Sequence, residues 1–224
     1  MARRVPALLL ALTLASCISG SDHRVPAPQR PMNSPAIALD LPPSRETLAC
    51  YAELTRDDVR FNMLPDRDYG GGCQQVGAVQ LVDFGMPVTN LKGMRCGLAR
   101  TLVAWIRNGV APAAQELLGS ELVKVESFGT YACRAVIGGA AERAGKVSEH
   151  ALANAVDVAA FVLRDGRRIS IERDWRSPDP GVRAFLDAVH RSACRRFVTV
   201  LSPDYNAAHY NHLHLDMGRG SLCR

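Results

Sequence analysis

The chain has 224 residues, of which 47% are hydrophobic and 22% are charged, an ordinary composition for a globular protein. This length suffices for one domain with its own core plus a tail. Without Arg3 and Arg4 the chain keeps 25 basic and 22 acidic residues, and a net charge of +3 is too mild and too dispersed to indicate a nucleic-acid partner.

Residues 1–16 predict a signal peptide. A short basic start precedes an apolar run from Val5 to Ala15, which is too short to remain as a membrane-spanning helix. The small residues before Cys17 resemble a bacterial lipobox, whose cysteine is acylated and becomes the first mature residue. We therefore expect lipidation at Cys17 and a periplasmic protein anchored to a membrane, and Ile18 favours the outer membrane over the inner. The alternative is a plain secretory signal whose cleavage region happens to contain Cys17.

Residues 17–43 follow as the acylated cysteine and a linker. Six prolines with serine and asparagine, and no helical or strand period, indicate an extended or disordered segment. The folded domain is expected over 44–224. Ser44 resembles an N-cap for a helix over 45–54, with Leu48, Tyr51 and Leu54 facing inward.

The remaining pattern predicts a single α+β domain, in which helices flank a small antiparallel sheet. A glycine turn is expected at 70–72, and Asp165-Gly166 favours a hairpin between its flanking strands. Hydrophobic spacing predicts core helices over 94–108, 112–118 and 182–197. Alternation predicts strands over 76–88, 122–128, 155–163, 167–173 and 212–216.

Six cysteines follow Cys17, an even number in an exported chain, and this favours disulfides in an oxidising compartment. Fifteen pairings are possible, so the sequence does not decide the connectivity. A cysteine metal site is a weaker alternative, because no two of them have Cys-x2-Cys spacing. The disulfide candidates are Cys50, Cys73, Cys96, Cys133, Cys194 and Cys223.

Two polar groups of residues indicate a metal site. Asp157 lies in a small, apolar run and needs a partner, because an unpaired buried carboxylate costs several kcal/mol. The two-residue period of a strand places His212, His214 and Asp216 on one face of the last strand. Catalytic zinc commonly takes three protein ligands, and two histidines with a carboxylate are a familiar set. A dication beside Asp157 would balance its charge.

These residues resemble a known group of zinc peptidases. Ser148-x-His150-x6-Asp157 followed by His212-x-His214 is similar to the pattern of the lysostaphin, D-alanyl-D-alanine peptidase and hedgehog superfamily. Tyr131-Ala-Cys-Arg134 is similar to the strand that precedes the Ser-x-His loop in the D-Ala-D-Ala branch. The whole run from Cys50 to Cys223 more closely resembles the bacterial extensin-like C-terminal domain.

The resemblance implies a role for each matching position. It implies His150, Asp157 and His214 as ligands of Zn²⁺. His212 would then transfer protons or support a ligand, His209 would be a further active-site histidine, and Arg134 would polarise the scissile carbonyl or hold a substrate carboxylate.

Two positions depart from the peptidase pattern. Asn211 stands where the D-Ala-D-Ala peptidases carry a glutamate base, and an amide cannot accept that proton, so His212 or His209 must act as the base if the protein is active. Ala153 replaces a glycine, which adopts more backbone conformations. Glu149 is a weaker candidate for the missing base.

The resemblance implies zinc-dependent hydrolysis of peptide bonds in peptidoglycan during cell-wall remodelling, as an endopeptidase or carboxypeptidase. Expected partners are peptidoglycan peptides, the membrane through the lipid anchor, and wall-synthesis or activator proteins. The alternative is a zinc-containing lipoprotein that binds peptidoglycan without cleaving it, and Asn211 supports that interpretation. The sequence does not identify the bond that is cut.

Overall fold

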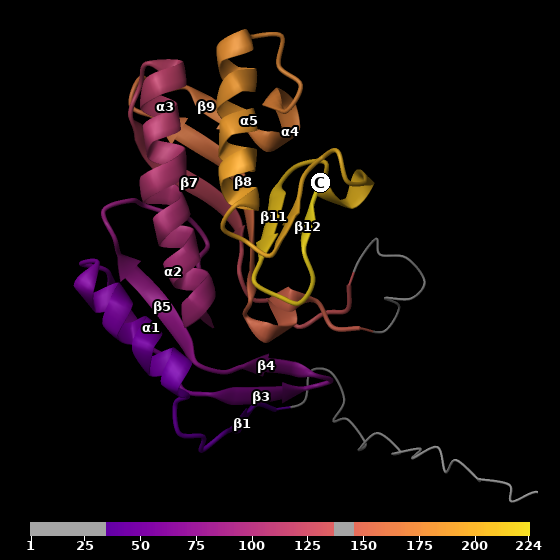
Figure 1. Cartoon of the computed structure of the whole chain (residues 1–224). Helices are drawn as coiled ribbons and strands as arrows, with labels where there is room; N and C mark the ends of the chain where they lie inside the picture. The colour runs from indigo at the N-terminus through magenta and orange to yellow at the C-terminus, as the bar shows by residue number, and fades with distance from the viewer. Residues whose placement is uncertain (1–34, 137–145) are drawn as a thin grey trace, which may run out of the picture.

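The computed structural model describes residues 35–136 and 146–224 (Figure 1). The expected signal peptide, Cys17 and the linker up to residue 34 lie outside the described residues. Within these ranges, no helix is long and apolar enough to cross a membrane. Helices and small sheets occur together, which confirms the α+β class.

The N-terminal part contains helix α1 and two small sheets. Helix α1 (Arg45–Arg56) begins at Ser44, whose hydroxyl accepts a hydrogen bond from the backbone N–H of Thr47 at 3.1 Å, as an N-cap does. Leu54 is buried as expected, but Leu48 is 53% exposed, so the inward face of the helix was predicted wrongly there. Antiparallel pairing joins β1 (Ile37–Ala38), β3 (Arg67–Gly70) and β4 (Cys73–Gln75), and separately β2 (Arg60–Met63), β5 (Ala78–Asp83) and β6 (Met94–Arg95).

Strand β1 lies inside the range that the sequence predicts as a linker, so ordered pairing begins upstream of residue 44. The expected glycine turn is present, because Gly70, Gly71 and Gly72 all have positive φ between β3 and β4. Of the short strands expected over 76–88, the structure forms β5, which ends at Asp83.

The two predicted central helices form one continuous rod. Helix α2 (Cys96–Trp105) passes through a π-helical segment (Ile106–Val110) into α3 (Ala111–Leu118) without a break. The N–H of Ala111 reaches the carbonyl of Ile106, the spacing of a π turn, immediately before Pro112. Pro112 has no N–H, so a regular α-helix would lose one hydrogen bond at this position. The wider π turn accommodates that loss, which is why Pro112 does not end the helix.

The main sheet has the order β12-β10-β11-β8-β7, and β9 also pairs with β8. It consists of β7 (Leu122–Gly129), β8 (Ala155–Leu163), β9 (Arg168–Ser170), β10 (Thr199–Leu201), β11 (Leu213–Asp216) and β12 (Leu222–Cys223). The β8–β9 hairpin is confirmed, although the chain turns into the short helix α4 (Ile171–Asp174) where a strand to 173 was predicted. Strand β11 begins at Leu213, one residue later than expected.

The core lies between this sheet and the helices. The α2–α3 rod and α5 (Pro180–Cys194) lie side by side in front of β7 and β8 (Figure 1). Trp105 is fully buried, packs edge-on against Phe161 and Phe197, and donates its indole N–H to the carbonyl of Val189 at 3.2 Å. Because this core fixes β8, it also fixes the position of the polar residues that β8 carries.

Three disulfides confirm the interpretation of the six cysteines. Cys50–Cys96 joins α1 to α2, Cys73–Cys133 joins β4 to the segment after β7, and Cys194–Cys223 joins α5 to β12. The second and third of these hold segments that border the candidate site.

Candidate metal centre

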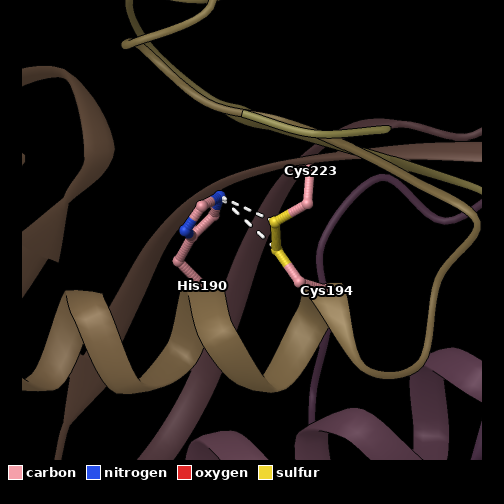
Figure 2. A group of neighbouring side chains, drawn as sticks. All are labelled: His190, Cys194 and Cys223. Atoms are coloured by element: carbon pink, nitrogen blue, oxygen red, sulfur yellow. Dashed lines mark hydrogen bonds between the residues drawn. A yellow bond between two sulfur atoms is a disulfide. The ribbon is translucent and has the colours of Figure 1, made fainter. Parts of the chain in front are cut away.

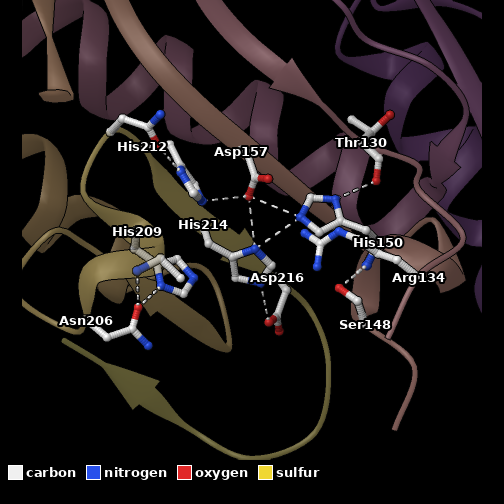
Figure 3. A network of polar contacts seen from close by, with 12 residues as sticks. Thr130, Arg134, Ser148, His150, Asp157, Asn206, His209, His212, His214 and Asp216 are labelled. Atoms are coloured by element: carbon white, nitrogen blue, oxygen red, sulfur yellow. Dashed lines mark hydrogen bonds and ion pairs between the residues drawn. The ribbon is translucent and has the colours of Figure 1, made fainter. Parts of the chain in front are cut away.

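Three elements bring a carboxylate and two imidazoles together (Figure 3). Asp157 on β8 and His214 on β11 are direct partners in the antiparallel register, so their side chains lie on the same face of the sheet. His150 comes from a short 3₁₀ helix, η3 (Glu149–Leu152), just before β8. Ser148 caps this turn by accepting from the backbone N–H of His150 at 3.3 Å.

The spacing of the three side chains matches a metal-ligand set. His150 Nε2 lies 3.1 Å from Asp157 Oδ1 and 3.2 Å from His214 Nδ1, and His214 Nδ1 lies 3.0 Å from Asp157 Oδ1. Two nitrogen or oxygen ligands at tetrahedral angles around a metal such as zinc are separated by about 3.3 Å. The triangle therefore has nearly the dimensions that one shared cation requires.

The outer hydrogen bonds determine which ring nitrogens carry protons. His150 Nδ1 lies 2.9 Å from the carbonyl oxygen of Thr130, and His214 Nε2 lies 3.0 Å from Asp216 Oδ2. Both oxygens only accept, so both ring nitrogens donate. In neutral imidazoles, His150 Nε2 and His214 Nδ1 then present lone pairs toward Asp157 Oδ1. Three lone pairs at this spacing need a positive charge among them, which a metal ion or a proton can supply.

The pKa values show the same demand for positive charge. Burial lowers the pKa of His214, but its hydrogen bonds to Asp157 and Asp216 outweigh burial and raise it to about 9. Burial raises the pKa of Asp157, yet hydrogen bonds to His150 and His214 hold it well below its ordinary range. In the metal-free protein a proton on His214 therefore occupies the position that fits a cation.

His212 lies beside this triangle. It precedes β11, and its Nε2 lies 3.5 Å from Asp157 Oδ1. Its Nδ1 lies 2.9 Å from Asn211 Oδ1, so Asn211 orients the ring with its amide oxygen. Burial lowers the pKa of His212, which keeps the imidazole neutral with its Nε2 lone pair toward the centre.

His209 is the second cleft histidine outside the triangle, on the 3₁₀ helix η4 (Ala207–His209). Asn206 Oδ1 accepts from the backbone N–H of Ala208 at 3.0 Å and lies 2.7 Å from His209 Nδ1, so the ring nitrogen donates to it. Burial, followed by the charge of His212, lowers the pKa of His209 to about 4. The His209 and His212 ring centroids are 5.2 Å apart.

His209, His212 and His214 line a cleft with a volume of about 1190 Å³. Arg134 lines it as well, and its positive charge is among the causes that lower the pKa of His209 and of His212. Glu149 also lines the cleft, but its Oε2 accepts from the side-chain amide of Asn154 at 2.7 Å. This bond assigns Glu149 a structural role and gives no support to its interpretation as the missing base.

The last residues of the chain form one wall of this cleft, from Met217 to Leu222. The Cys194–Cys223 disulfide fixes this segment to α5, and His190 Nε2 lies 3.7 Å and 3.9 Å from its two sulfur atoms (Figure 2). This group also has the spacing of a metal site. However, its sulfur atoms are bonded to each other and offer no thiolates, so it serves here as a crosslink.

The structure brings together the residues that the sequence selected: His150, Asp157 and His214 in the triangle, with His212, His209 and Arg134 around them. Sequence reasoning missed Thr130, which acts through its backbone carbonyl, and Asn206, which orients His209. A backbone acceptor leaves no residue signal. Asn206 stands three residues before His209, a spacing that becomes informative only once the turn is known.

Comparison with known proteins gives one match. The family model described as extensin-like protein C-terminus matches residues 48–224. No curated protein and no solved structure matches the chain.

Proposed function

Because the chain belongs to the extensin-like protein C-terminus family, we propose that it is a zinc-dependent hydrolase of peptide bonds in peptidoglycan. The observation that carries this proposal is the triangle of His150, Asp157 and His214, whose free lone pairs converge at the spacing of one metal ion. A proton needs only two of these atoms, whereas a metal uses all three. The resemblance of the motifs to zinc peptidases supplies the choice of zinc and of substrate.

His150, Asp157 and His214 would hold the ion, and Thr130 and Asp216 would fix the two rings in the ligating orientation. Bound zinc lowers the pKa of water toward 7 and polarises a carbonyl oxygen. His214 of the triangle lines the cleft together with His209 and His212, so a substrate in the cleft can approach the candidate ion site.

His212 is the proton carrier in this proposal. Its Nε2 would accept the proton of the attacking water as the C–O bond forms, and would return it to the amine as the C–N bond breaks. Asn211 would hold the His212 ring in position for this transfer. Its amide would thus orient the base, whereas the glutamate of the D-Ala-D-Ala peptidases acts as the base itself. His209 remains neutral and is placed to bind or relay beside His212.

Arg134 would stabilise negative charge on the peptide carbonyl or hold a substrate carboxylate. Its charge reaches both cleft histidines, and its guanidinium has a planar fork suited to either task. Location is part of the proposal: cleavage before Cys17 and acylation would tether the domain, through its proline-rich linker, to a membrane next to the wall.

The test combines metal analysis with digestion of purified cross-linked muropeptides, with the products identified by mass spectrometry. The purified protein should contain one zinc per chain and release peptide fragments. His150→Ala should lose both metal and cleavage. His212→Ala should keep the metal but lose about 100-fold or more in rate, as removal of an acid–base group does. His190→Ala, a histidine outside the cleft, is the matched control.

Full cleavage by His150→Ala would refute the mechanism. Stoichiometric zinc and muropeptide binding without cleavage by the unmodified protein would instead favour the alternative of a binding module.

A further inference from the structure

The cleft beside the triangle carries an excess of free positive charge. Its two acidic side chains are already engaged, Glu149 by Asn154 and Asp216 by His214. No ion pair joins its basic side chains to any acidic group within the described residues. These basic side chains are Arg95, Arg134, Lys146 and Arg219.

Arg95 differs from a solvated surface arginine. Its Nε is buried, and in residues 35–136 and 146–224 nothing accepts a hydrogen bond from it, although the side chain lines the cleft. Because Nε has almost no exposed surface, a ligand in the cleft would bind to the terminal nitrogens of the guanidinium, for which the described residues supply no acceptor either.

The backbone holds Arg95 close to the metal-binding turn. Its N–H donates to the carbonyl of Ala153 at 2.7 Å, and Ala153 ends the 3₁₀ turn that carries His150. Arg95 also begins helix α2, which Cys50–Cys96 crosslinks to α1. The Arg95 Cα is therefore fixed relative to the candidate centre by covalent and hydrogen-bonded structure.

We propose that Arg95 binds a free carboxylate of an acidic wall peptide and so selects the substrate. This inference rests on the proposed function, because it takes the occupant of the cleft to be a peptide. Arg134 and Arg95 both line the cleft, and the backbone bond to Ala153 places Arg95 at the C-terminal end of the His150 turn. A cleft of about 1190 Å³ is larger than a single amino acid fills, so one peptide can reach both arginines.

A carboxylate is the group that this arginine fits. The guanidinium fork matches a planar carboxylate with two parallel hydrogen bonds, and a carboxamide presents one oxygen and one competing donor. Peptides with free side-chain or terminal carboxylates should thus bind more tightly than their amidated forms.

The test uses two synthetic cross-linked stem peptides that differ only in whether the acidic side chain is free or amidated. Binding is measured calorimetrically in the His212→Ala background, so that hydrolysis does not consume the peptide. Arg95→Gln should weaken binding of the free-acid peptide by about 10- to 100-fold and leave the amidated peptide within about twofold. Arg95→Lys keeps the charge and should lose less.

The control is Arg60→Gln, an exposed arginine on β2 paired with Asp83, which should alter neither affinity. Equal affinities of the two peptides, equal losses for both peptides on Arg95→Gln, or displacement of the free-acid peptide by inorganic phosphate would overturn the inference. Binding and cleavage are read separately. If the unmodified protein prefers the free-acid peptide through Arg95 but does not cleave it, the proposed hydrolase activity is rejected and the carboxylate site stands. If it cleaves the peptide without that preference, the carboxylate site is rejected and the hydrolase activity stands.

Discussion

Asp216→Asn tests whether the outer hydrogen bonds really set the metal-binding state of His214. Asp216 accepts twice: Oδ2 from His214 Nε2 at 3.0 Å, and Oδ1 from the backbone N–H of Gly218 at 2.8 Å. The N–H of Gly218 needs an oxygen. In the Asp216→Asn protein the new amide oxygen therefore stays with Gly218, and the NH₂ group faces His214 Nε2.

That arrangement favours the wrong tautomer for metal binding. His214 would accept at Nε2 and carry its proton on Nδ1, the nitrogen that points toward Asp157 and His150. Ligation through Nδ1 would place two buried donors against each other, and each unsatisfied donor costs about 1–3 kcal/mol. The combined cost of about 2–6 kcal/mol predicts a zinc Kd raised about 30-fold to about 10⁴-fold.

The assay is zinc titration against a chelator of known affinity, with circular dichroism to verify the fold. Asp165→Asn, at an exposed aspartate bonded to Arg167, is the matched control and should bind zinc normally. Wild-type zinc affinity in a folded Asp216→Asn protein would refute the tautomer argument.

Three further predictions concern stability. The metal-free protein should lose stability as pH rises from about 6.5 toward 9, because the raised pKa of His214 stabilises the fold only while that ring is protonated. It should also lose stability below about pH 4, because the lowered pKa of Asp157 stabilises the fold only while that carboxyl is ionised. A melting temperature in chelator that is flat from pH 6.5 to 9 would contradict the first part. Ala153 has a φ of 53°, in the left-handed region. Ala153→Gly should change the unfolding free energy by less than about 1 kcal/mol in urea titration, because relief of about 1–2 kcal/mol of backbone strain offsets the lost buried methyl group and the freer unfolded chain. Ala153→Val should destabilise the protein by more than about 1 kcal/mol. The double variant Cys194→Ala, Cys223→Ala opens a 29-residue loop and should cost about 3–4 kcal/mol by the same titration, and an unchanged midpoint would show that the crosslink is not stabilising.

The sequence was informative about the site where chemistry and strand period coincide. His214 and Asp216 could be placed on one face of the last strand because alternation fixes side-chain direction, and Asp157 was identified because an isolated acid in an apolar run needs a counter-charge. The pairing of β8 with β11 brings residues 57 positions apart into contact, and no local pattern predicts that register.

The misses have physical causes as well. Leu48 has the correct helical spacing, but α1 packs through a narrow face and leaves that position in solvent. Pro112 predicts a helix boundary, and the π turn before it removes the need for one. The role of Asn211 could not be predicted, because the sequence shows only that an acid is missing, whereas the structure shows the amide bonded to His212.

Strand β11 has a neighbour on each side, β8 and β10, so it occupies an interior position of the main sheet although it is among the last segments of the chain. The three side chains of the triangle come together only when β11 pairs with β8, a contact between residues 57 positions apart. A form of the domain in which β11 is not paired would therefore carry an incomplete candidate centre.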